Sequence, residues 1–204
     1  MDSSPDGTTG YRRSAGSPRG QARRRDLLDR VTDDLAVNGL VDFSLRRAAR
    51  AAGTTHKVLL YHFAGADELL VEAVHKLRER RITKGLAATA GPATRSLADR
   101  VRALWPVLIG DEGAVLDQAI GLAMYDPIRY AALGRDNSQQ YLPTLFAICP
   151  QVWPELRKLE VAEMIMAVLR GFLVDARTSG DTIGIAAGFE AFARALEREE
   201  NAVG

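Results

Sequence analysis

The feature that most constrains the fold of this chain lies between residues 23 and 70, where three short helical patterns each end at a residue that stops a helix. The first pattern repeats apolar residues at helical spacing, so that one stripe faces inward: Leu27, Leu28, Val31 and Leu35. Asn38-Gly39 follows and supplies the left-handed residue that closes such a helix. The sequence therefore predicts a helix that ends near Asn38.

The second pattern begins after Ser44, whose hydroxyl can accept a free backbone N–H at the start of a helix. The apolar positions of residues 45–52 form one buried face. The charged positions are then left pointing outward: Arg46, Arg47 and Arg50. Gly53 breaks this helix, which predicts a tight turn before the next element.

The third pattern is a very short helix through residues 56–60, capped by Thr54 or Thr55. A helix this short cannot stand alone, because nucleation costs more than one or two turns return. Leu59 and Phe63 are expected to hold it against the first two helices. The remaining side chains can then face a DNA groove with hydroxyl, methyl and ammonium groups: Thr54, Thr55, His56, Lys57 and Tyr61. A helix, a tight turn and a second helix form a helix-turn-helix.

In these residues the chain resembles the DNA-binding domain of the tetracycline-repressor (TetR) family of bacterial transcription regulators. The resemblance rests on four runs: Phe43-Ser44-Leu45-Arg46-Arg47-Ala48-Ala49, Ala52-Gly53-Thr54-Thr55, Leu60-Tyr61-His62-Phe63 and Asp67-Glu68-Leu69-Leu70. It implies that Ser44 and Thr55 bond phosphates at helix starts and that Lys57 and its neighbours face the major groove. It also implies that Tyr61 and His62 touch the DNA backbone. The expected DNA contacts are Ser44, Arg46, Thr54, Thr55, His56, Lys57, Tyr61 and His62.

Two positions depart from the family pattern. Ala66 stands where the family usually has a phosphate-binding lysine, and Leu60 stands where a first tyrosine is most common. Losing one phosphate contact lowers DNA affinity and flattens its salt dependence by about one unit. Upstream arginines offer compensating charge: Arg12, Arg13, Arg19 and Arg23 to Arg25.

Charge and composition indicate three regions. Residues 1–21 are predicted to be a disordered basic arm, either lying along a minor groove or simply solvated. Residues 22–66 form the helix-turn-helix domain, and residues 67–204 form a larger helical domain for effector binding and dimerisation. The formal charge is +4 over residues 1–63 and −3 over the remainder, so the basic excess coincides with the helix-turn-helix.

The rest of the chain is helical in pattern, and the fold class is all-α. A helix is expected from about residue 67 past Arg81, and others over 97–108, 114–125, 138–148, 154–173 and 185–196. Pro106 is expected to kink or interrupt the second of these, and Asn137 or Ser138 to start the fourth. The last two helices are more apolar than one buried side requires, which predicts a homodimer built as a four-helix bundle, with ordinary packing within the chain as the alternative. Its expected contacts are Met164, Val168, Gly171, Phe172, Ile185, Gly188, Phe189 and Phe192.

An effector pocket within the second domain is implied by the family resemblance, although an aromatic stripe is more often plain core. Its candidate lining is apolar and aromatic: Trp105, Leu108, Leu122, Tyr125, Tyr141, Phe146, Met164 and Val168. A small apolar or aromatic effector is the expected ligand.

Catalytic and metal chemistry find no support in the sequence. His56, His62 and His75 do not share one helical face, and phosphate loops and nucleophile motifs are absent. The single cysteine, Cys149, fits a buried thiol better than a nucleophile. No cofactor, metal or membrane partner is expected, and a cytoplasmic location is the default.

The leading hypothesis is a dimeric transcription regulator, most simply a repressor that binds a palindromic operator in double-stranded DNA and is released by its effector. A helical architectural or interaction protein with little sequence preference and no effector is the alternative. A third hypothesis is an all-α enzyme that carries the same DNA-binding domain. No cluster of polar residues typical of a catalytic site is evident in residues 67–204 to support it.

Overall fold

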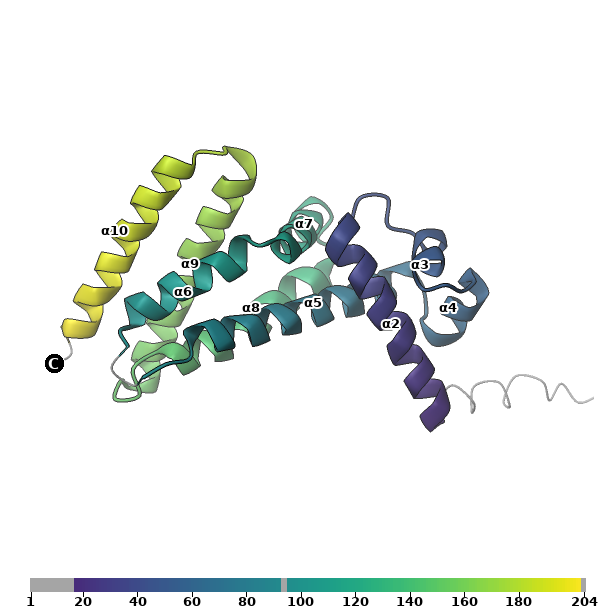
Figure 1. Ribbon diagram of the computed structural model, residues 1–204, viewed down its shortest axis with the longest axis horizontal. Coiled ribbons are helices and arrows are strands. Elements are labelled where there is room, and N and C mark those ends of the chain that lie inside the picture. Colours follow the sequence, from purple (N-terminus) through teal and green to yellow (C-terminus); the bar gives the residue numbers. More distant parts are fainter. Residues whose placement is uncertain (1–16, 93–94, 203–204) are drawn as a thin grey trace, which may run out of the picture. The chain divides into compact units, whose positions relative to one another are not determined.

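The computed structural model describes residues 17–92 and 95–202, apart from the side chains of residues 135–137. These residues form helices without strands, which confirms the all-α class, and they divide into two compact units at Lys76 (Figure 1). The helices are α2 (Pro18–Asn38), α3 (Leu45–Ala51), α4 (His56–His62), α5 (Ala66–Thr89), α6 (Leu97–Ile109), α7 (Asp111–Tyr125), α8 (Ala131–Ile148), α9 (Glu155–Thr178) and α10 (Thr182–Asn201). Among them, none combines the length and the apolar character that crossing a bilayer requires.

The first helix begins earlier than the sequence patterns suggested. Ser17 caps α2 by accepting a hydrogen bond from the Gly20 amide at 3.1 Å, and Pro18 occupies the first helical position. The predicted basic arm therefore does not extend to residue 21, because residues 18–21 are helical. Residues 1–16 lie outside the described part of the chain.

The first unit is built on the predicted apolar stripe. Leu27, Val31 and Leu35 are fully buried on α2, whereas Leu28 is only half-buried and lies at the margin of that stripe. Helix α3 packs against both α2 and α4. Leu59 and Phe63 are buried at either end of the last turn of α4, as expected for the residues that hold this short helix in place.

The division between the units falls inside α5, about ten residues beyond the boundary predicted from the sequence. The first turns of α5 belong to the first unit because they are tied to it by side chains. Glu68 and Glu72 pair with Arg24 of α2, and Lys76 pairs with Asp29 of the same helix.

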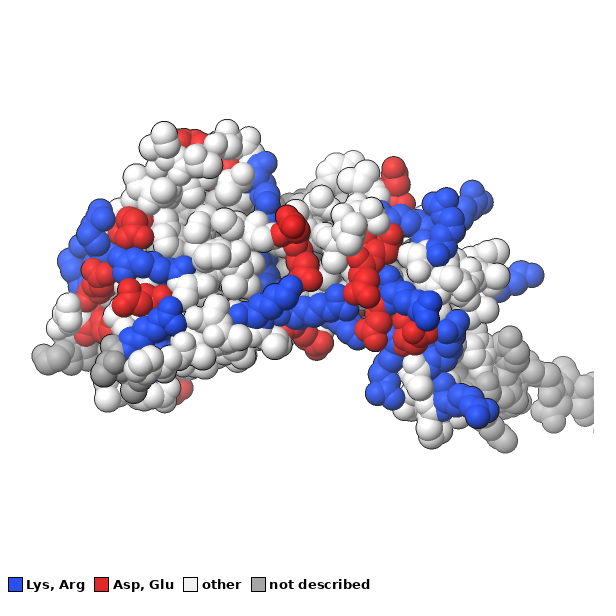
Figure 2. All heavy atoms as spheres, viewed as in Figure 1, with Lys and Arg blue, Asp and Glu red and all other residues white. Residues whose placement is uncertain are grey.

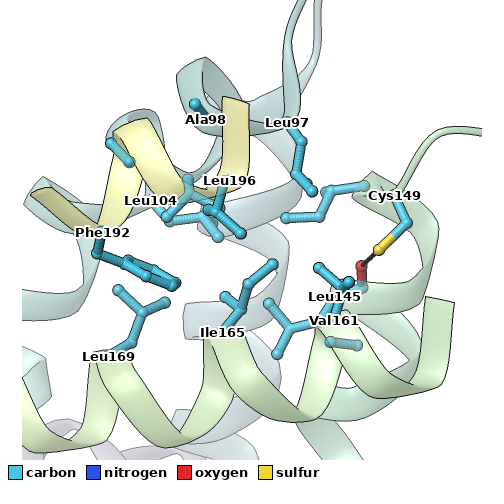
Figure 3. Close-up of a cluster of buried hydrophobic side chains, with 14 of the residues drawn as sticks. Leu97, Ala98, Leu104, Leu145, Cys149, Val161, Ile165, Leu169, Phe192 and Leu196 are labelled. Carbon is cyan, nitrogen blue, oxygen red and sulfur yellow. Dashed lines mark hydrogen bonds between the residues drawn. The ribbon is translucent and has the colours of Figure 1, made fainter. Parts of the chain in front are cut away.

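The second unit has its core among α6, α8, α9 and α10. Figure 3 shows Leu104, Ile165 and Leu196 converging from three of these helices, with Phe192 lying over Leu169. At one end of this cluster the buried Cys149 thiol donates to the Leu145 carbonyl at 3.3 Å. Burial raises the pKa of Cys149 to about 11.

The structure answers two expectations about helices of the second unit. Pro106 lies inside α6, which continues to Ile109, so the helix is not interrupted there. Helix α8 begins at Ala131 rather than near Asn137. Residues 127–130 form a turn before it, and the Asp126 carboxylate accepts the Arg129 amide there at 3.0 Å.

Candidate nucleic-acid interface and interior cavity

Helix α4 has the form of a recognition helix that is held by packing. It contains seven residues, and Thr55 caps it by accepting the Val58 amide at 3.4 Å. The turn before it contains Gly53 at φ +61°, a left-handed conformation that side chains rarely adopt. With Leu59 buried, the exposed side chains of this segment include Thr55, His56 and Lys57.

Positive charge without an internal counterion gathers on α3 and α4. Arg46, Arg50 and Lys57 are exposed, and none makes an ion pair with any residue in the described ranges. Figure 2 shows basic side chains standing out from the surface formed by these two helices. Such charges are free to meet phosphate groups.

Arg47 is not among these outward-facing charges, contrary to the sequence prediction. Its guanidinium pairs with Asp34 at 2.8 Å and donates to the carbonyl oxygens of Val41 and Gly39 at 2.7 and 2.8 Å. The side chain therefore closes the connection between α2 and α3. A single arginine can satisfy several carbonyl groups because its five N–H groups are arranged as a fork.

Arg24 is likewise a structural residue and not a spare positive charge for DNA. Its Nε donates to the carbonyl of His62, the last residue of α4, at 3.0 Å. Its other N–H groups bond Glu72 and Glu68, and its guanidinium lies 4.5 Å from the centre of the Phe63 ring. Arg24 thus joins α2, the end of α4 and the start of α5.

The two aromatic candidates at the end of α4 are half-buried. Tyr61 and His62 meet edge to face with ring centres 4.9 Å apart. Burial, helped by the charges of Arg24 and Arg23, lowers the pKa of His62, and its Nδ1 is buried without a hydrogen-bond partner. His62 is therefore neutral at pH 7.

The remaining DNA-contact candidates lie before α3 and in the turn before α4. Ser44 is exposed and caps α3 by accepting the Arg47 amide at 3.3 Å, while Thr54 is half-buried in the turn. Ala66 begins α5 and offers no cation of its own at that helix start. The structure thus brings the eight predicted DNA contacts onto α3, α4 and the turn between them.

The second unit contains a cavity among α5, α6, α7, α8 and α9, with about 660 Å³ of atom-free space counting its open mouth. Most of its lining is apolar: Ile82, Gly85, Leu104, Val107, Leu108, Ile120, Leu145, Met166, Leu169 and Leu173. The polar side chains are few: Arg81, Asp117, Tyr141, Thr144 and Arg170.

Some polar groups that line this cavity have hydrogen-bond partners and others do not. Arg81 is only 6% exposed, and its Nη2 donates to the Leu108 carbonyl at 3.0 Å, but its Nε has no partner. The buried Tyr141 hydroxyl also has no acceptor among the described residues, because its polar neighbour, the Arg81 guanidinium 5.8 Å from the tyrosine ring centre, can only donate. Asp117 instead accepts from Arg177 at 3.1 Å.

Sequence reasoning found only part of this lining. Leu108 and Tyr141 line the cavity as predicted. Tyr125 is 88% exposed, so its assignment to the pocket was wrong. Five other candidates do not line it: Trp105, Leu122, Phe146, Met164 and Val168. Trp105 instead packs against Phe172 and Phe189, at ring-centre distances of 6.2 and 5.1 Å.

The predicted dimer contacts need a similar correction. Ile185, Phe189 and Phe192 are buried within this chain, so they are not available to a partner. Met164, Val168 and Phe172 pack partly against the same core. Gly188 lies under the Phe172 ring, where an added Cβ would stand 3.0 Å from Cε1. Gly171, by contrast, is exposed with open space around it.

Metal chemistry has no evident site. Over residues 17–92 and 95–202, no group of three or more His, Cys, Asp or Glu side chains is arranged to hold a metal ion.

Comparison with known proteins shows which solved structures share this fold. No protein-family model matches the sequence, and neither does any curated protein sequence. Solved structures do match. A putative TetR-family transcriptional regulator from Rhodococcus sp. is 15% identical, with a TM-score of 0.64 over 86% of this chain and 97% of that one. The multidrug binding protein EbrR, complexed with imidazole, is 16% identical, with a TM-score of 0.64 over 95% and 96%.

A third match is the transcriptional regulator FadR from Bacillus subtilis in complex with stearoyl-CoA. It is 13% identical, with a TM-score of 0.61 over 84% of this chain and 96% of that one. The chain therefore has the fold of TetR-family regulators, and the resemblance inferred from residues 23 to 70 is confirmed at the level of the fold.

Proposed function

We propose that this protein is a transcription regulator that binds a palindromic operator as a homodimer and is released from it by a small molecule. The observation that carries the proposal is the exposed face of α4, a seven-residue helix fixed by Leu59 and presenting Thr55, His56 and Lys57 outward. Helices of this kind read base edges in the major groove while neighbouring cations bond phosphates.

A twofold dimer is part of the proposal because operator recognition by this motif uses two half-sites. Two recognition helices must stand about 34–36 Å apart, or a multiple of that, to enter successive major grooves. The side chains of α9 and α10 that this chain leaves exposed are the candidates for the contact. They include Gly171, Val174 and Ile183 in place of the buried residues first considered.

Release by a ligand is supported by the cavity of the second unit. EbrR and FadR, which share the fold, are described with imidazole and stearoyl-CoA bound. The cavity gives this chain an apolar interior space with a few polar groups, which is the usual character of a small-molecule site. A ligand that favours one conformation by several kcal/mol would move most molecules off DNA.

The experiment is operator selection from a random duplex library, followed by gel-shift titration at several salt concentrations. Selection of a palindrome is expected. Lys57→Ala should weaken binding by about 1–3 kcal/mol and lower the salt slope by about one. Lys84→Ala is the matched control, because it removes the same charge from a side chain that pairs with Glu112 in the second unit. Equal binding to selected and random duplexes would instead favour an architectural DNA-binding protein.

A further inference from the structure

The lining of the interior cavity includes hydrogen-bond donors with no acceptor. Arg81 Nε and the Tyr141 hydroxyl are both buried and donate to no group among the described residues, and the guanidinium beside the hydroxyl is itself only a donor. Burying a polar group without a hydrogen bond costs free energy, and a buried charge without a counterion costs more. Two such groups in one lining point to an acceptor that comes from outside the chain.

The charges around the cavity favour an anion over a cation. Its lining contains two guanidinium groups, Arg81 and Arg170, and one carboxylate, Asp117. Arg177 already bonds that carboxylate, whereas Arg81 makes no ion pair with any described residue. Arg170 donates to the neutral Ser138 hydroxyl at 3.2 Å. Asp117 offsets part of the Arg81 charge, but the lining keeps one more cation than anion, which disfavours a ligand ammonium.

Tyr141 completes the acceptor site as a neutral donor. Burial raises the pKa of its phenol, and the charges of Arg81 and Arg78 offset this only in part. The hydroxyl therefore stays protonated and can donate a hydrogen bond to an anionic oxygen. Hydrogen bonds with one ionised member are shorter and stronger than those between neutral groups.

The rest of the cavity fits an apolar body. Leucine, isoleucine, valine and methionine side chains from α5, α6, α7, α8 and α9 surround the remaining space. A ligand of hydrocarbon or aromatic character would bury its surface there.

We infer that the cavity takes an apolar monocarboxylic acid, whose carboxylate accepts hydrogen bonds from Arg81 and Tyr141 while its hydrocarbon part fills the apolar remainder. This inference rests on the proposed function, since it names the chemical class of the releasing ligand. It assigns Arg81 and Tyr141 as the residues that select an acid over its neutral and cationic analogues.

The test is isothermal titration calorimetry of the full chain without DNA at pH 7.5. The probes are 3-phenylpropionate, octanoate and 2-naphthoate, each compared with the amide and the amine of the same carbon skeleton. We expect at least one acid to bind, its amide to bind at least about tenfold more weakly, and its amine not to bind. Failure of all three acids, or an amide or amine equal to its acid, would overturn the inference.

Variants locate the carboxylate. Tyr141→Phe should weaken acid binding about tenfold and leave the melting temperature of the free protein unchanged or higher, because the lost hydroxyl has no acceptor. Tyr125→Phe removes the same atom from an 88% exposed side chain and should change neither quantity. Arg81→Gln should weaken the acid about a hundredfold. If it does not fold, Tyr141→Phe alone decides, and unchanged acid affinity in that variant contradicts the inference.

The two proposals fail separately. A chain that selects an operator but binds none of the acids would refute the ligand class and leave DNA binding standing. A chain that binds acids through Tyr141 but selects no DNA sequence would support the ligand site and refute the regulator.

Discussion

Replacing Arg24 with methionine tests the claim that this arginine stabilises the first unit by holding α2, the end of α4 and the start of α5 together. Methionine keeps the apolar stem that packs along the protein and removes only the guanidinium. The guanidinium contacts four partners in the structure: the His62 carbonyl, the two carboxylates of α5 and the Phe63 ring. All four contacts are lost together.

The expected loss can be worked out contact by contact. The hydrogen bond to the His62 carbonyl contributes about 1 kcal/mol. The side chains of Arg24 and Glu72 are 32% and 29% exposed, so each ion pair is screened and contributes about 0.5 kcal/mol. Stacking on Phe63 adds about 0.5 kcal/mol. Arg24→Met should therefore lower the free energy of unfolding by about 2–3 kcal/mol, shifting a urea midpoint by about 1 M.

Urea unfolding followed by circular dichroism measures this loss. Arg23→Met is the matched control: Arg23 makes one exposed ion pair with Asp26, so its loss should cost no more than about 0.5 kcal/mol. Gel shifts below the unfolding transition add a second reading. Since Arg24 is committed to internal partners, its variant should keep the salt slope of DNA binding. Equal urea midpoints for the two variants would refute the structural role of Arg24. So would a salt slope of DNA binding that is reduced by about one in Arg24→Met.

Three further perturbations follow from the first unit. Leu35→Ala should destabilise it by about 2–5 kcal/mol, because Leu35 is fully buried, and circular dichroism would show the lower midpoint; a loss under about 1 kcal/mol would contradict its place in the core. Ala66→Lys should tighten operator binding and steepen the salt slope by about one, by adding a phosphate contact at the start of α5; an unchanged slope in gel shifts would show that residue 66 faces away from DNA. His62 has a lowered pKa in the folded chain, so unfolding takes up a proton as the pH falls below about 6.5 and stability declines there. His62→Gln should lose less urea resistance between pH 7.5 and 5.5 than the unaltered chain, and an equal loss in both would count against the shift.

The sequence predicted the first unit well because its signals are local. Apolar spacing located Leu27, Val31 and Leu35 in the core, and the hydroxyl residues Ser44 and Thr55 marked two helix starts that the structure confirms. Periodicity and capping depend on neighbours within about one helical turn, which a single sequence displays directly.

This local reasoning could not predict which arginines are buried and which are exposed. The helical spacing of Arg47 and Arg81 is typical of solvent-facing positions. In the structure both guanidinium groups instead donate to backbone carbonyls outside their own helices, those of Gly39 and Leu108. A long cationic side chain is buried where a fork of N–H groups meets such acceptors, and that meeting depends on tertiary structure.

The same reason explains the misplaced pocket. Aromatic residues were favoured as lining, but Trp105 packs with Phe172 and Phe189 in the core, while the cavity lies among aliphatic side chains. Which apolar residues fill space and which border it depends on how five helices meet, a property that no window of sequence contains.

The single cysteine gives this protein a built-in reporter of its own opening. Cys149 lies at the end of the core of α6, α8, α9 and α10, its thiol bonded to the Leu145 carbonyl and its pKa raised to about 11. A thiol reagent can react with it only after that core has opened and the thiolate has formed. The rate of labelling therefore records how often the core of the second unit opens, and any ligand that occupies the cavity of that unit should slow the rate without an engineered probe.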